Sequence, residues 1–315
     1  TAIEWFSRAL ALTERMEADA DRSATLLDLA RCEMAGGSYE GALALCDQAE
    51  RLFERLDDAR GKAETALVRS QGLWYLGEYQ RAFVAQRSAL AYAEKAEDLR
   101  LGIMAHSQGG LINLNIGDLE AAERALGEAL DKARTAQLAD EEAVQLNNLG
   151  IVAREKGELD QALARFGQAL AIDTRLKNAL GRAYDLRNIG IVEQMQERWK
   201  PAREHLEEAL RLTRTIGDRF NQVKVLQGLA RLELARGNLQ RARDHAQQAF
   251  DLSERLGLRE VAWRALRTLG EIARRLGNPE DALGWYRRAI DLVEGMRAGL
   301  RVESFRSGFL DNKYD

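Results

Sequence analysis

A turn recurs along this chain at one fixed spacing of about 40 residues. The seven copies of the turn begin at Gly37, Gly77, Gly117, Gly157, Glu197, Gly237 and Gly277. Alanine follows five positions later in every copy and again after seven more, giving two unbroken columns that include Ala162 and Ala169. A fixed period of this length is typical of a solenoid, in which each repeat packs only on its neighbours. We therefore expect one continuous repeat domain, although 315 residues alone would suggest two domains.

Each repeat reads as a pair of amphipathic helices. In residues 143–182, apolar side chains recur at helical spacing from Val144 to Ala153, and Gly157 then ends the first helix. A second apolar face runs from Leu159 to Ile172. Strong helix formers dominate the composition, and no alternating run of β-branched residues indicates a strand. The expected fold class is therefore all-α.

Small residues also fill a third column, in the first helix of every repeat. The column reads Ala30, Ser70, Gly110, Gly150, Gly190, Ala230 and Gly270. Larger side chains alternate with the small ones, such as Leu149 and Phe166 in the fourth copy. Close packing in protein interiors requires small residues where two helices cross and larger ones between the crossings. The three columns therefore predict the points at which the helices approach most closely.

These columns resemble the tetratricopeptide repeat (TPR) pattern. The matching residues in the fourth copy are Leu149-Gly150, Gly157, Leu159, Ala162, Phe166 and Ala169-Leu170. The spacing exceeds the usual family period of about 34 residues, and the proline that often closes a unit is absent. Units of this longer period, with links such as positions 216–219, resemble the kinesin-light-chain and Pins-type subgroup. Because Glu197 replaces the glycine of the fifth turn, we expect a local distortion there.

The resemblance implies a right-handed superhelical TPR solenoid of about seven helical hairpins plus a leading single helix. We place the solenoid at residues 1–300, with the second helix of a preceding repeat at 1–18, where Phe6 and Ala9 match the columns of Cys46 and Ala49. The repeats are expected near residues 23–62, 63–102, 103–142, 143–182, 183–222, 223–262 and 263–300. Because the chain starts halfway through a repeat, we interpret it as a piece of a longer protein.

Nothing in the sequence predicts catalysis. The three histidines, His106, His205 and His245, lie in different repeats, and no metal-ligand spacing, P-loop or dinucleotide motif accompanies them. We therefore expect a non-enzymatic protein with no cofactor and no metal. Cys32 and Cys46 are expected to be reduced and buried, although a disulfide between the two helices of one repeat is an alternative.

Composition also excludes several classes of partner. No apolar stretch is long enough to span a bilayer, and the N-terminal segment does not read as a signal peptide, so we expect a cytoplasmic protein with no membrane partner. The formal net charge of −4 gives no support to direct nucleic-acid binding. Acidic residues exceed basic ones in residues 1–60, and the balance reverses in residues 259–306.

The first helices carry the residues expected to bind a protein or peptide. In TPR arrays the first helix of each pair lines the concave surface, and the resemblance implies that polar columns there face a ligand. The amides in these columns can donate and accept together, which suits an extended peptide, and the arginines suit carboxylates. The alternative is a solvated polar wall. The candidate residues are Gln108, Asn147, Asn148, Arg187, Asn188, Lys224, Gln227, Arg231, Arg264, Arg267 and Arg274. Trp74 and Tyr75 are either a hydrophobic anchor for the peptide or packing residues.

Residues 301–315 leave the repeat register. Glu303-Ser304, Arg306-Ser307, Phe309-Leu310 and Lys313 resemble the junction in bacterial proteins where a TPR array precedes a CHAT domain, a caspase-like cysteine protease. The resemblance implies a connector to an intramolecular C-terminal effector that the array regulates, and some relatives partner a CRISPR effector. Two alternatives stay open: a stand-alone adaptor or peptide sensor, and the sensor arm of a nucleotide-driven signalling protein whose ATPase precedes residue 1.

Overall fold

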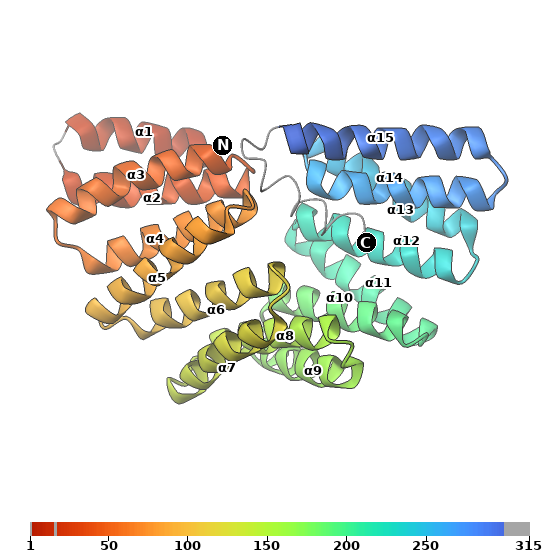
Figure 1. Cartoon of the computed structure of the whole chain (residues 1–315), viewed down its shortest axis with the longest axis horizontal. Coiled ribbons are helices and arrows are strands. Elements are labelled where there is room, and N and C mark those ends of the chain that lie inside the picture. Colours follow the sequence, from red (N-terminus) through yellow and green to blue (C-terminus); the bar gives the residue numbers. More distant parts are fainter. Residues whose placement is uncertain (1, 16–17, 299–315) are drawn as a thin grey trace. The chain divides into compact units, whose positions relative to one another are not determined.

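The computed structural model describes residues 2–15 and 18–298, which fold into helices α1 to α15 with no strand among them (Figure 1). The first helices of the repeats are α2 (Asp19–Ala35), α4 (Ala59–Tyr75), α6 (Leu99–Asn115), α8 (Ala139–Glu155), α10 (Ala179–Met195), α12 (Arg219–Ala235) and α14 (Arg259–Arg275). The second helices are α3 (Tyr39–Arg55), α5 (Tyr79–Lys95), α7 (Leu119–Thr135), α9 (Leu159–Arg175), α11 (Trp199–Ile216), α13 (Leu239–Arg255) and α15 (Pro279–Ala298), and α1 (Ala2–Arg15) precedes them all. The all-α prediction is confirmed.

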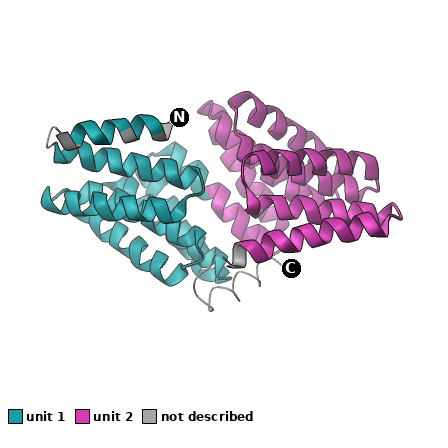
Figure 2. Cartoon of the chain, turned by 90° about the horizontal axis from the view of Figure 1, so that it is seen from above, with its two compact units in different colours: residues 1–145, 308–315 teal, residues 146–307 magenta. Residues whose placement is uncertain are grey.

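The helices pack as consecutive pairs within two compact units, one reaching residue 145 and the other starting at residue 146 (Figure 2). In the first unit α2 packs on α3 and α4 on α5, and α1 packs on α2. In the second unit α10 packs on α11, α12 on α13 and α14 on α15. Neighbouring first helices also contact one another: α12 contacts both α10 and α14. Within each unit the first helices therefore form one layer and the second helices another.

The alanine and glycine columns occupy the helix crossings, as the sequence predicts. Ala162 and Ala169 are completely buried, and no alanine of either column is more than 7% exposed. At Gly150, a Cβ atom would lie 2.6 Å from the ring of Phe166 on the paired helix. The same test at Gly190 places a Cβ atom 2.7 Å from Leu206. The small column of the first helix thus receives the large side chains of the second helix.

The helices follow a regularity finer than the repeat of about 40 residues. The starts of helices α2 to α15 are evenly spaced at half the repeat period, and the turns within repeats and the links between repeats have equal length except after α11, where the link is one residue shorter. Each of these connections contains one residue at positive φ, and the non-glycine examples are Asp57, Glu97, Gln137, Lys177 and Glu197. Glycine marks most turns within repeats, whereas polar residues mark most of the links. The recurring glycine therefore indicated only the turns within repeats and not the links between them.

Polar caps at the links determine where the first helices begin. The side chains of Asp58, Asp98, Asn178 and Asp218 each accept a hydrogen bond from the backbone N–H three positions later. Such caps satisfy donors that have no partner inside the helix. Helix α8 begins at Ala139, whereas the repeat was expected to begin near residue 143, and the other first helices are shifted in the same way.

The fifth turn is regular, so the expected distortion at Glu197 is wrong. Glu197 has a φ of 59° and donates its N–H to the Gln194 carbonyl over 3.0 Å, as Gly157 does to Arg154 in the preceding repeat. The left-handed conformation costs a residue with a Cβ atom about 1 kcal/mol relative to glycine. The helices on either side hold the turn in place despite this cost.

The cysteines, the apolar character of the helices and the grouping of metal-ligating side chains can be described for the same residues. Cys32 and Cys46 carry free thiols, and burial raises the pKa of Cys46 to about 12. Within residues 2–15 and 18–298, no helix combines the length and the apolar character that crossing a membrane requires. The same residues contain no cluster of three or more His, Cys, Asp or Glu side chains placed to hold a metal ion. The proposed connector at 301–315 lies outside the described residues.

Candidate functional site

The predicted binding residues lie on consecutive first helices. Helix α8 carries Asn147 and Asn148, α10 carries Arg187 and Asn188, α12 carries Lys224, Gln227 and Arg231, and α14 carries Arg264, Arg267 and Arg274. All of these belong to the second unit, whereas Gln108 lies on α6 in the first unit. Because α12 contacts α10 and α14 directly, side chains from these three helices are brought together in space.

Three of the predicted residues hydrogen-bond to one another rather than standing free. The Asn188 Nδ2 atom donates to Asn147 Oδ1 over 3.0 Å, and Arg187 Nη2 donates to Asn188 Oδ1 over 3.2 Å. Arg187 Nη1 also donates to Asn221 Oδ1 over 2.8 Å, and Asn147 Nδ2 donates to Asp185 Oδ1. Asn188 is only 1% exposed. Its amide therefore holds α8 and α10 together, and its side chain is buried rather than exposed on the helix face.

This hydrogen-bonded chain ends at a buried pair of carboxyl groups, Asp173 of α9 and Asp185 of α10. Their exposed fractions are 4% and 1%. Burial raises the pKa of Asp185 to about 8, and the charge of Asp173 adds to this, while the hydrogen bond from Asn147 opposes it. Asn178 Nδ2 donates to Asp173 Oδ1 over 2.9 Å. Burial beside a second carboxyl group therefore favours a proton held by this pair at neutral pH.

Four arginines from four successive first helices form the most charged part of the predicted surface. We call Arg154, Arg187, Arg231 and Arg267 the arginine cluster. Burial lowers the pKa of Arg187 to about 10, and the charge of Arg154 acts in the same direction. Desolvation by neighbouring atoms also lowers the pKa of Arg231, and the charges of Arg267 and Arg154 contribute. These guanidinium groups are therefore close enough to repel one another.

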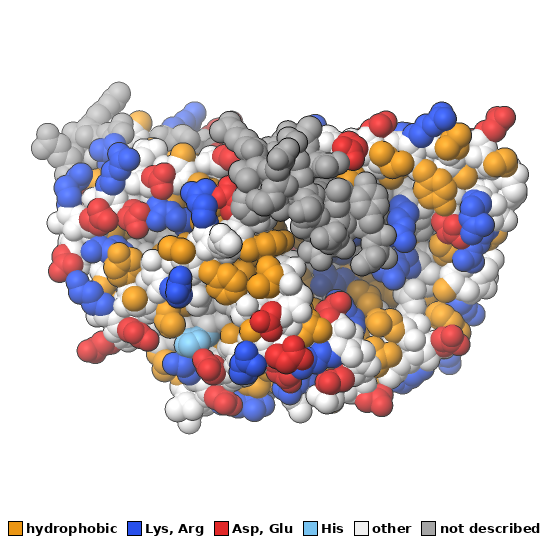
Figure 3. All heavy atoms as spheres, viewed as in Figure 1, with side chains coloured by type: hydrophobic (Ala, Val, Ile, Leu, Met, Phe, Trp, Pro, Cys, Tyr) orange, Lys and Arg blue, Asp and Glu red, His pale blue; other side chains and the backbone are white. Residues whose placement is uncertain are grey.

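The arginine cluster is only partly compensated by acidic side chains, although the charge of Asp218 attracts Arg187. Arg154 pairs with Glu155 over 2.6 Å, and Arg187 donates to the neutral amides of Asn221 and Asn188. Arg231 and Arg267 are exposed and have neither a hydrogen bond nor an ion pair with any side chain that the structure describes. Elsewhere basic and acidic side chains are interspersed, as the face in Figure 3 shows. The cluster is thus a place where a bound anion relieves electrostatic repulsion.

The remaining predicted residues of α12 and α14 differ in the groups that they contact. The Lys224 ammonium lies 4.1 Å from the ring centroid of Phe220, and the exposed Arg264 guanidinium lies 4.9 Å from that of Trp263. Gln227 Nε2 donates to the Val261 carbonyl over 2.6 Å and so joins α12 to α14. Gln227 is therefore a structural residue, whereas Lys224 and Arg264 present cations beside aromatic faces.

Arg274, Asn148 and Gln108 add less to this surface. Arg274 donates to both carboxylate oxygens of Glu271, over 2.7 and 2.9 Å, and the bonds from Arg274 and Arg275 lower the pKa of Glu271 to about 2. Asn148 is half-buried. Gln108 is also half-buried, and its Nε2 atom has no hydrogen-bond partner among the described residues. Arg274 is thus neutralised locally.

The aromatic pair Trp74 and Tyr75 packs against other residues of the first unit, and Tyr75 is 38% exposed. Trp74 is partly buried against the cluster around Leu73, and the Tyr75 ring stacks on Tyr39 with centroids 4.8 Å apart. The packing interpretation therefore describes this pair better than a free peptide anchor. Arg154, Asp173 and Asp185 could not be identified from the sequence, because each reads as an ordinary charged residue of a solvated helix face.

Comparisons with known proteins identify the repeats. The tetratricopeptide repeat family model matches residues 140–215 and 221–295, so the chain contains tetratricopeptide repeats in these segments. No match is found among curated protein sequences.

Solved structures of TPR proteins share the fold. A Rap protein complexed with competence and sporulation factor has a TM-score of 0.70 and 19% identity, covering 95% of this chain and 86% of that chain. The Rap conjugation gene regulator of plasmid pLS20, in complex with the Phr* peptide, has a TM-score of 0.71 and 17% identity, covering 88% and 74%. A STAND signal-transduction ATPase with a TPR sensor from Pyrococcus horikoshii has a TM-score of 0.63 and 16% identity, covering 96% of this chain and 48% of that chain. At these identities the similarity shows the TPR solenoid fold alone.

Proposed function

We propose that this chain is a non-enzymatic scaffold that binds a protein or peptide through the first helices of its second unit. The observation that carries the proposal is the arginine cluster, in which Arg231 and Arg267 are accessible and lack acidic partners among the described residues. Arginine forks recognise carboxylates through paired hydrogen bonds, so the ligand is an acidic segment. Lys224 and Arg264 extend the basic surface along α12 and α14.

Two of the similar solved structures support a peptide ligand. One Rap protein is complexed with the competence and sporulation factor, and the pLS20 regulator is complexed with the Phr* peptide. Their fold is shared with this chain, which supports a ligand of the same class here. Successive first helices start 40 residues apart, and so do successive second helices. This repeat length supports the proposed relation to the kinesin-light-chain subgroup.

We further propose that the repeats regulate an effector domain in a longer protein, and two observations favour different effectors. The sequence of residues 303–313 favours a CHAT protease that follows the array, with a CRISPR-associated role as its narrower form. The similarity to the STAND ATPase favours a sensor arm, and this chain spans about half the length of that protein. The gene sequence on either side of this segment distinguishes the two effectors, and a gene with neither supports the stand-alone adaptor.

Binding to an acidic probe tests the scaffold proposal. The probe is a synthetic peptide rich in Asp and Glu, and its matched partner carries Asn and Gln at the same positions. We expect the parent protein to bind the acidic peptide with an affinity that falls as salt is raised. Arg231→Glu with Arg267→Glu should weaken binding by about tenfold or more, because two attractive charges become repulsive.

A matched variant controls for the change in net charge. Lys200→Glu with Arg243→Glu makes the same charge change at exposed positions of second helices. We expect this control to bind the acidic peptide as the parent does. Equal affinity of the parent and the Arg231/Arg267 variant in calorimetry, or equal affinity for both peptides, would overturn the proposed role of the arginine cluster.

A further inference from the structure

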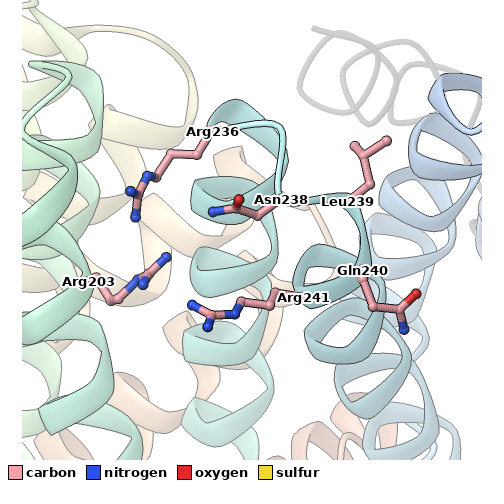
Figure 4. Close-up of a pocket in the computed structure, with 6 residues that line it drawn as sticks. All are labelled: Arg203, Arg236, Asn238, Leu239, Gln240 and Arg241. Atoms are coloured by element: carbon pink, nitrogen blue, oxygen red, sulfur yellow. The ribbon is translucent and has the colours of Figure 1, made fainter.

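A second basic site lies away from the arginine cluster, at the turn that joins α12 to α13. A cavity of about 500 Å³ is lined by six residues: Arg203, Arg236, Asn238, Leu239, Gln240 and Arg241. Arg203 comes from α11, and the others come from the end of α12 and the start of α13. Figure 4 shows the side chains of Arg203, Arg236, Asn238 and Arg241 directed toward the same space, whereas Leu239 and Gln240 point away from it.

Arg203 is held in position by a buried carboxylate. Glu233 of α12 is 2% exposed, forms an ion pair with Arg203 Nη2, and also accepts a hydrogen bond from Asn238 Nδ2 over 2.7 Å. The Arg203 Nε atom is buried without a hydrogen-bond partner among the described residues. The Glu233 carboxylate is thus bound by both Arg203 and Asn238. The guanidinium of Arg203 is therefore fixed before any ligand arrives.

Arg203 replaces an apolar side chain that other repeats carry at the same position. Leu43, Phe83 and Leu163 occupy this position in other repeats, and Phe83 packs on the core of the first unit around Leu73, whereas the position of Glu233 holds glutamate in other repeats as well. A half-buried arginine at this position costs desolvation that an apolar side chain avoids. The structure thus departs from the repeat where it builds the cavity, which indicates a role other than packing.

The positive charge at the cavity exceeds the negative charge by two. Arg236 and Arg241 are exposed, and neither has a hydrogen-bond or ion-pair partner among the residues that the structure describes. Glu233 compensates one of the three arginines, and Gln240 directs its amide to Asp244 over 3.0 Å. The Asn238 side chain does not cap α13, so the positive end of the helix dipole adds to the field.

We propose that this cavity binds a phosphoryl group. A phosphomonoester carries between one and two negative charges at neutral pH, which matches the excess of positive charge better than a single carboxylate does. Its oxygens accept paired hydrogen bonds from guanidinium forks, and three such groups converge on the cavity. Free phosphate and a phosphorylated side chain of a partner share this chemistry. The site uses no residue of the arginine cluster and does not depend on the proposed peptide binding.

Calorimetric titration with inorganic phosphate, with a phosphoserine peptide and with the same peptide unphosphorylated tests the proposal. The main variant is Arg236→Gln with Arg241→Gln, because both side chains are exposed and their loss leaves the Arg203–Glu233 pair intact. Arg214→Gln with Arg243→Gln is the matched control, since it removes two exposed arginines of second helices that do not line the cavity.

We expect the parent and the control to bind the phosphorylated probes alike, and the Arg236/Arg241 variant to bind them about tenfold more weakly or worse. Tighter binding of the phosphopeptide than of inorganic phosphate identifies a phosphorylated side chain as the ligand, and equal binding identifies the free anion. Absence of phosphate binding by the parent, or equal binding by parent and Arg236/Arg241 variant, overturns the proposal. Arg231→Glu with Arg267→Glu should leave phosphate binding unchanged, which separates this site from the peptide site.

Discussion

Replacing Asp185 by asparagine should make the protein more stable at neutral pH and change how its stability depends on pH. Asp185 is 1% exposed beside Asp173, and burial raises its pKa to about 8. In the unfolded chain its pKa returns to about 3.9. Between these values the folded protein therefore holds a proton that the unfolded chain has released. An asparagine keeps an oxygen that accepts from Asn147 and needs no proton.

The sign of the effect follows from the number of bound protons. Because the folded state binds one proton more than the unfolded state, the free energy of unfolding falls as the pH rises from about 4 to about 8. For a single proton the slope is about −1.4 kcal/mol per pH unit at most. Asp173 and Asp185 titrate together, so this slope belongs to the pair. Between pH 5 and pH 7 the free energy of unfolding of the parent should therefore fall by about 2–3 kcal/mol because of this pair. Asp185→Asn should not show this fall.

Urea unfolding of both proteins at pH 5, 6 and 7 measures this difference. Other groups also titrate in this range, since burial lowers the pKa of His106 and of His245. Their contributions are the same in both proteins and disappear when the variant is compared with the parent. Asp291→Asn, an exposed carboxylate on α15, is the matched control and should run parallel to the parent. A constant difference between Asp185→Asn and the parent from pH 5 to pH 7 would refute the buried protonated pair.

Three further predictions concern the packing and the turns of the repeat. Ala169→Leu should lower the free energy of unfolding by about 1–3 kcal/mol because the site is completely buried, whereas the surface change Glu158→Gln should stay within about 0.5 kcal/mol, and urea melts of both variants check this. Gly150→Ala should cost about 1–3 kcal/mol, since a Cβ atom there meets the Phe166 ring at 2.6 Å, and a melting temperature equal to that of the parent would contradict the crossing. Glu197→Gly should raise stability by about 1 kcal/mol, because Glu197 sits at a φ of 59°, and a lower midpoint in the same melts would count against this reading of the turn.

The architecture could be predicted because it depends on residues that repeat. Two alanine columns and one column of small residues placed the helix crossings, and the structure buries Ala162, Ala169 and their equivalents there. The links between repeats were harder to see. Lys177 adopts a positive φ as Gly157 does, but a lysine gives no sequence signal for that conformation. Asn178 caps α10 from the next position, so the helix starts earlier than its apolar pattern suggests.

The polar interior could not be predicted because its partners belong to different repeats. Asn147 donates to Asp185, 38 residues away, and Asn188 donates back to Asn147, 41 residues away. A polar column read along one helix face shows which residue types are present, but not whether their amides face a ligand or each other. Burial decides between the two, and a sequence pattern does not give the burial of single residues beside a helix crossing.

The two proposed sites differ in how far they could be predicted from the sequence. The arginine cluster lies on first helices, where the family resemblance directed attention, so Arg187, Arg231 and Arg267 were identified from the sequence. The cavity at the α12–α13 turn depends on Arg203 and Glu233, which stand 30 residues apart on α11 and α12. Arg203 stands where other repeats carry Leu43, Phe83 and Leu163, and a charged residue in a mostly apolar column is costly unless its partner is close. A departure of this kind that is paired with a buried charge on the next helix therefore marks a candidate site better than the regular columns do, because packing explains the columns and leaves the departure unexplained.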